Sequence, residues 1–144
     1  MTPDELAIIR GDGQVMHDLA DAFATTFYAT LFELAPATRS LFPDDLVAQR
    51  GKLVDELGFL IEAATSIDDG LGDFVERASE LGRRHVEYGV TGNDYVPVGQ
   101  ALIAALRSCI DDWDDEHEAA WMKLYRLIAD VMREGTEARL FSAG

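Results

Sequence analysis

The chain has 144 residues, of which 48% are hydrophobic and 27% are charged, a composition typical of one folded globular domain with a substantial core. The formal net charge of −15 would repel a phosphate backbone or an anionic membrane surface, so we expect no nucleic acid and no membrane as a partner. The sequence has no apolar run of membrane-spanning length and does not begin like a signal peptide, which predicts a cytoplasmic protein.

The first expected helix begins with a capping pattern. Thr2 is a typical N-cap, Pro3 suits the first helical position, and Glu5 is placed to reach back to the cap. Gly11 and Gly13 weaken the helix interior, each by up to about 1 kcal/mol relative to alanine. Helical periodicity resumes after them.

Helical spacing predicts a second helix over about 18–34 and a third over about 46–65. The apolar stripe of the second helix consists of Leu19, Phe23, Phe27, Leu31 and Leu34. Tyr28 lies one residue off this stripe, so its hydroxyl needs a hydrogen-bond partner or a ligand at the edge of the core. Pro36 ends the helix, and a short helical turn then leads to a corner at Phe42. In the third helix, Gln49 and Leu53 share a face.

The next helix carries a histidine on its apolar face. Phe74, Ala78, Leu81 and His85 fall on one side at helical period, while the charged residues lie mostly elsewhere. An isolated inward histidine is more often a core residue bonded to a backbone carbonyl than a functional group. Only residues elsewhere in the sequence can distinguish a core histidine from a functional one. Gly89 is expected to end this helix.

Two further helices are expected in the C-terminal third. Helical spacing runs from Tyr95 to Trp113, and Asp115 with Glu118 predicts a cap at the start of the last helix. The apolar stripe of the last helix consists of Trp121, Leu124, Tyr125, Ile128 and Met132. Cys109 lies among apolar neighbours and is expected to be an inert thiol. Without period-2 strands or repeats, the chain is predicted to be all-α, with about seven helices around one core.

Several segments carry a resemblance to a known family. They are TTFYATLF (25–32), RSLF (39–42), QRGKL (49–53), RRHVEYGV (83–90), YVPVGQALIAAL (95–106) and AWMKLYRLIADV (120–131). In this order and spacing they resemble the globin domain of bacterial flavohaemoglobins and their single-domain relatives, over about 20–142. The resemblance implies a globin fold, a single globin domain over 1–144, and haem b as the cofactor.

The resemblance also implies the site residues. His85 becomes the proximal ligand of the haem iron, with Tyr28 and Gln49 as the distal polar residues that act on the bound gas. The residues that would bind the cofactor are Phe42, Leu53, Arg84, His85, Tyr95 and Val98. A neutral imidazole is a good iron ligand, and a tyrosine hydroxyl can donate a hydrogen bond to a partly negative oxygen.

The proximal side departs from the family pattern. In the family, a tyrosine and a glutamate hold the proximal histidine in a hydrogen-bonded set. Tyr95 matches the tyrosine, but the glutamate position falls on Thr136, with Glu137 one residue later and Glu134 on another side. Either Glu137 or Glu134 completes the set, or the charged partner is missing. The corner between Phe42 and Gln49 is also shorter than is usual in the family.

The resemblance implies that a five-coordinate iron binds oxygen and other diatomic gases. It further implies nitric oxide dioxygenation, with electrons from an external donor or reductase. An oxygen carrier or store without turnover is the alternative, as is a haem-based sensor. A helical bundle that has lost haem and binds a protein partner is a fourth hypothesis. A homodimer is compatible with single-domain relatives.

Overall fold

The computed structural model describes the backbone of residues 1–65, 70–87 and 94–143, and the side chains of residues 1–65, 74–85 and 94–134. Regular structure in these ranges consists of six α-helices and one 3₁₀-helix, without a strand. The elements are α1 (Pro3–Asp18), α2 (Ala20–Leu34), η1 (Pro36–Leu41), α3 (Val47–Thr65), α4 (Gly70–Glu87), α5 (Tyr95–Cys109) and α6 (Asp115–Ala143). The predicted all-α fold is confirmed. Gly89, the expected helix end, lies outside the described residues.

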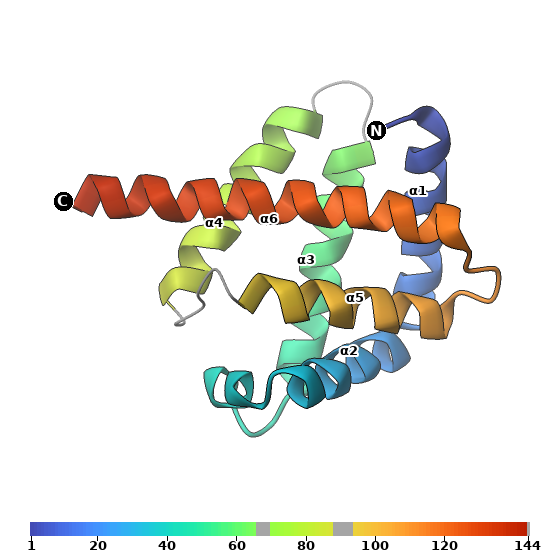
Figure 1. Ribbon diagram of the computed structural model, residues 1–144, viewed down its shortest axis with the longest axis horizontal. Coiled ribbons are helices and arrows are strands. Elements are labelled where there is room, and N and C mark those ends of the chain that lie inside the picture. The colour runs from blue at the N-terminus through green and yellow to red at the C-terminus, as the bar shows by residue number, and fades with distance from the viewer. Residues whose placement is uncertain (66–69, 88–93, 144) are drawn as a thin grey trace.

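The helices form two crossing layers (Figure 1). α5 and α6 run across the front of the view, and α3 crosses behind them. α4 packs against α6, α2 packs against α5, and α3 contacts α1, α2 and α4. None of the described helices combines the length and apolar character of a membrane span.

Most of the apolar positions expected from helical spacing lie in the core. The largest fully buried side chains are those of Trp121, Phe23, Phe74, Ile9, Met16, Leu31, Leu60, Leu106 and Leu124. Leu19 and Leu34 were expected in the stripe of the second helix, but they are 44% and 49% exposed. The prediction was wrong at these two positions because Leu19 stands between α1 and α2, and Leu34 is the last residue of α2. Helical spacing therefore does not determine which way these two terminal side chains face.

α1 continues without a break through Gly11 and Gly13. Between them, Asp12 is buried, and its Oδ2 accepts hydrogen bonds from Nδ1 of His117 at 2.7 Å and from Nε1 of Trp121 at 2.8 Å. These bonds join the middle of α1 to α6. Tertiary contacts therefore offset the weak helix propensity of the two glycines.

Two other glycines allow helices to approach closely. A Cβ atom on Gly82 of α4 would lie 2.3 Å from the backbone oxygen of Met132 in α6. A Cβ atom on Gly99 of α5 would lie 2.6 Å from the ring of Tyr125 in α6. A larger residue at Gly82 would have to push the α6 backbone away, whereas one at Gly99 would have to displace the Tyr125 ring. Gly82 lies one turn before His85, so this contact also fixes the position of the His85 region of α4 relative to α6.

The caps agree with the sequence at the first helix and differ at the last. The Thr2 hydroxyl accepts a hydrogen bond from the Glu5 backbone amide at 3.2 Å, as expected for an N-cap. At the start of α6, the carboxylate of Asp114 accepts the bond from the backbone amide of His117 at 3.0 Å, whereas Asp115 was expected to be the cap. Asp114 lies just outside the helix and Asp115 inside it, so only Asp114 faces the open amides.

Candidate functional site

Tyr28, Phe42 and Gln49 come together although they belong to three segments of the chain. Tyr28 lies on α2 and is 4% exposed. The ring of Phe42, directly after η1, meets the Tyr28 ring edge to face with centroids 5.4 Å apart. Gln49, in the first turn of α3, interacts with the Tyr28 hydroxyl through its side chain. The structure therefore brings the three residues together: the Tyr28 hydroxyl and the Gln49 side chain are the polar groups, and the Phe42 ring packs against Tyr28.

The surroundings of Tyr28 keep its hydroxyl protonated. Burial raises the pKa of Tyr28, and the interaction with Gln49 only partly opposes this effect. The ring centroids of Phe27 and Phe32 lie 5.1 Å and 5.9 Å from that of Tyr28, so these two rings complete its apolar surroundings. A protonated phenol in such surroundings is a hydrogen-bond donor in a region of low dielectric constant.

α3 leads from this cluster towards α4. Leu53 lies one turn after Gln49 and is partly buried against the core. Glu56, a further turn along, forms ion pairs with two arginines of α4, at 3.0 Å to Arg84 and at 3.4 Å to Arg77. These ion pairs fix the two helices side by side.

His85 lies near the end of α4 with its Nδ1 atom 2.8 Å from the backbone oxygen of Leu81. A carbonyl only accepts, so Nδ1 carries the proton and the lone pair of the neutral ring is on Nε2. Burial lowers the pKa of His85, and the nearby Arg84 acts in the same direction. The hydrogen bond to Leu81 and the charge of Glu56 oppose the shift without cancelling it. The ring is therefore neutral at physiological pH, the form that binds a metal.

Arg84 is the neighbour of His85 and has one unused donor. One of its terminal nitrogens donates to Glu56, but its Nε atom is buried and has no hydrogen-bond partner among the residues that the structure describes. A buried unsatisfied N–H is costly and is rare in native proteins. This position can accommodate an acidic group of a ligand.

The other expected cofactor residues lie on α5. Tyr95 is buried at the start of this helix, and Val98 is partly buried one turn later. The guanidinium of Arg133, on α6, stacks over the Tyr95 ring at 4.8 Å from its centroid. Glu134 is exposed, and the side chain of Glu137 lies outside the described residues. Among the described residues, the charged side chain that stacks on the Tyr95 ring is thus the cation of Arg133.

Sequence reasoning did not identify Arg39, which binds the corner after η1, or Asp12, which binds α6. Asp12 could have been noticed, because it lies three residues after Ile9 and four before Met16, on the buried stripe of α1. Arg39 has no comparable signal, because its partners are backbone carbonyl groups.

Comparison with known proteins identifies the family of this fold. The globin family model matches residues 25–132, and the chain belongs to the globin family. Globins bind haem.

Two proteins of known class and one solved structure illustrate the relationship. A leghemoglobin from Psophocarpus tetragonolobus is 26% identical over 92% of this chain and 96% of its own length. A flavohemoprotein from Deinococcus radiodurans is 30% identical over the whole chain, which spans 36% of that protein. A bacterial globin from Campylobacter jejuni superimposes with a TM-score of 0.82 and 19% identity, over 98% of this chain and 99% of the other.

Proposed function

We propose that this globin binds haem b, with His85 as the axial ligand of the iron, and that residues 1–144 act as one globin domain. The observation that carries the proposal is the state of His85, a neutral ring whose Nδ1 proton is bonded to Leu81. This bond fixes the ring orientation and leaves the lone pair on Nε2, as in histidines that bind metals.

The other two histidines of the sequence do not suit this role. His17 is exposed at the end of α1. His117 is bonded to Asp12 at the contact between α1 and α6. We therefore propose a five-coordinate iron whose sixth position takes the gas.

Arg84 supports the choice of cofactor. Its buried Nε–H, which has no partner in the described part of the chain, is a suitable donor to a haem carboxylate. Leu53, Phe42 and Val98 would supply apolar contact area around the ring. The residues that the chain presents thus fit a flat, largely apolar cofactor with acidic groups.

When bound, haem supplies an iron that binds oxygen and other diatomic gases reversibly. The Tyr28 hydroxyl and the Gln49 amide would then act on the bound gas by donating hydrogen bonds to its negative end. The surrounding aromatic rings exclude water, so each hydrogen bond is stronger than it would be at the surface.

We further propose nitric oxide dioxygenation as the reaction. One nitric oxide and one oxygen give one nitrate, and each cycle consumes one electron. The likeness to flavohemoproteins supports this reaction, as do the two polar groups beside the gas position. Because the chain spans about a third of those relatives, the test supplies the electrons from a separate reductant.

An oxygen carrier is the second candidate. Its support is the likeness to a leghemoglobin, which this chain covers almost from end to end. Both candidates use the same haem and the same distal donors, and they differ in whether the protein turns over.

Nitrate yield separates the two functions. The haem-loaded, oxygen-saturated protein is mixed with excess nitric oxide and oxygen, with and without an added reductase and its nucleotide. We expect many nitrates per protein with the reductant and about one without it. A yield limited to one nitrate per protein in both cases would exclude the enzyme and favour the carrier.

A further inference from the structure

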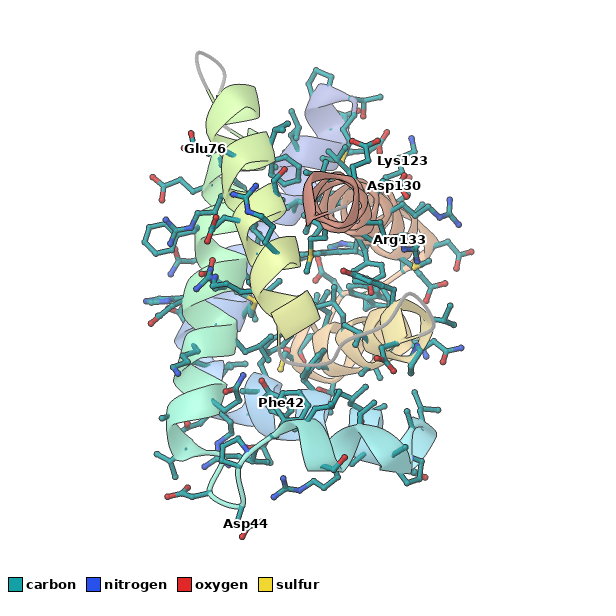
Figure 2. All side chains as sticks on the ribbon, turned by 90° about the vertical axis from the view of Figure 1, so that its left-hand side faces the viewer. Phe42, Asp44, Glu76, Lys123, Asp130 and Arg133 are labelled. Carbon is teal, nitrogen blue, oxygen red and sulfur yellow. The ribbon has the colours of Figure 1, made fainter. Side chains whose placement is uncertain are left out.

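The corner between η1 and α3 is held by one side chain. Nη1 of Arg39 donates to the backbone oxygens of Phe42 at 3.4 Å and of Pro43 at 2.9 Å, and Nη2 donates to the backbone oxygen of Asp44 at 3.0 Å. Three successive carbonyl groups thus share one guanidinium. In Figure 2, Phe42 lies on the side of the corner that faces the helices, and Asp44 lies at its outer tip.

The same guanidinium also contacts the aromatic cluster around Tyr28. It lies over the Phe32 ring, 5.1 Å from the centroid. The Phe32 ring in turn lies 5.6 Å from that of Phe42 and 5.9 Å from that of Tyr28. Arg39 therefore touches both the backbone that carries Phe42 and a ring against which Phe42 packs.

The corner also determines where α3 begins. Directly after Asp44, the carboxylate of Asp45 accepts a hydrogen bond from the backbone amide of Val47 at 3.0 Å, and α3 starts there. Gln49 follows in the first turn. A shift of the corner would therefore move Gln49 and Phe42 together relative to Tyr28.

We propose that Arg39 is a positioning residue for the distal side of the site, where its guanidinium holds the corner so that Phe42 and Gln49 face Tyr28. The effect on gas binding rests on the haem function proposed above, whereas the effect on the corner does not. Lysine cannot replace this arginine, because an ammonium group lacks the planar fork that reaches several acceptors while stacking on a ring.

The first experiment measures amide hydrogen exchange in the protein without haem. Arg39, Phe42 and Asp44 line an open surface pocket, so solvent reaches the corner as soon as the carbonyl bonds open. In Arg39→Lys and Arg39→Met we expect exchange at the hydrogen-bonded amides of Phe42 and Val47 to accelerate about tenfold, as the loss of charge-assisted bonds implies. Ser40→Ala removes another side-chain bond of η1, to the Ala37 oxygen, and should leave these rates unchanged.

Unchanged exchange in Arg39→Met would overturn the proposal, whether or not the protein binds haem. Wild-type exchange rates in Arg39→Lys would also contradict it, because a positive charge alone would then be sufficient to hold the corner.

The second experiment measures oxygen dissociation from the haem-loaded variants. We expect Arg39→Met to release oxygen several-fold faster than wild type and Ser40→Ala to match wild type. In a Phe42→Ala background the Arg39 effect should shrink, because the two residues act through the same corner. Faster exchange with an unchanged dissociation rate would show that Arg39 holds the corner but does not position the distal residues. Absence of haem binding by the wild type would refute the proposed function and leave the exchange result to decide the role of Arg39.

Discussion

At the scale of single residues, Tyr28 combines burial with a polar neighbour on another helix. Its hydroxyl stays protonated because burial raises its pKa, and Gln49 is its polar neighbour. In the proposed site this hydroxyl is the donor that holds the gas, and Gln49 assists it. Removing one oxygen atom therefore tests the role of the distal side without a large change in shape.

Tyr28→Phe should speed oxygen dissociation from the haem-loaded protein about tenfold, if the hydroxyl contributes about 1.5 kcal/mol to the bound state. Stopped-flow displacement of oxygen measures this rate. The matched control is Tyr125→Phe, which removes the hydroxyl of a partly buried tyrosine that donates to the Tyr95 backbone oxygen. Equal rates in wild type and Tyr28→Phe would show that Tyr28 does not act on the gas.

At the scale of the helices, the contact of α4 with α6 at Gly82 positions His85. The backbone oxygen of Met132 occupies the space of a Cβ atom there, and a backbone cannot rotate away as a side chain can. The same helix face carries Phe74 and Ala78, both fully buried. α4 therefore has little freedom to shift without disturbing the core.

Gly82→Ala should lower the free energy of unfolding by about 1–3 kcal/mol, because the added methyl group overpacks the contact. Urea unfolding followed by circular dichroism measures this change. Gly58→Ala in α3 is the control, because no atom lies within 4 Å of the added Cβ. That variant should be neutral or gain up to about 1 kcal/mol from helix propensity. A Gly82→Ala protein as stable as Gly58→Ala would contradict the close packing of α4 on α6.

The sequence predicts the helices and part of the site, for reasons that the structure explains. Apolar spacing reports which face of a helix is buried, so the helices and the inward face of the His85 helix follow from it. It does not report contacts between elements. The bond from His85 to Leu81 is local and could be anticipated, whereas the Arg39 contacts with carbonyl groups depend on how the corner folds. Helix ends are the least certain, which is why the cap at α6 falls on Asp114.

At the scale of the whole molecule, two groups of side-chain contacts join α1 to α6, and each contains one acid–base pair. One is buried and links Asp12 to His117 and Trp121. The other lies nearer the surface, where Lys123 meets Glu5 at 2.9 Å. Figure 2 shows Lys123 on the outer side of α6. The two pairs respond to pH in different ranges.

The buried pair should make stability depend on pH near neutrality. Burial disfavours protonation of His117, but the hydrogen bond and charge of Asp12, with Asp114 and Asp112, outweigh burial and raise its pKa. A raised folded pKa means that the added stability is complete below the unfolded value, about 6.5, and is lost as the pH rises through the folded pKa. Wild type should therefore become less stable across this range, and His117→Gln should show a flatter profile. Urea unfolding between about pH 5.5 and 8 measures both.

Asp12→Asn should remove the same pH dependence and cost about 1–3 kcal/mol, because the amide oxygen can still accept hydrogen bonds but lacks the charge that strengthens the bond from His117. Lys123→Gln serves as the control at the exposed pair, where solvent screens the charges and the expected loss of stability is much smaller. The pKa of Glu5 is lowered, chiefly by its bond to Lys123, so this contribution is lost only in acid, as the pH falls through the folded pKa. If the free energy of unfolding changes with pH in the same way for wild type, His117→Gln and Asp12→Asn near neutrality, then a charged pair between His117 and Asp12 is ruled out.

The central claim is that His85 binds the haem iron, and one absorption measurement tests it most directly. Wild type, His85→Gly, and His85→Gly with added imidazole are each titrated with haem, and the ferrous spectra are recorded with and without carbon monoxide. We predict a Soret band of a five-coordinate histidine complex in wild type, its loss in His85→Gly, and its return when imidazole fills the vacated position. An unchanged wild-type spectrum in His85→Gly without imidazole, or no haem uptake by wild type, would contradict the assignment.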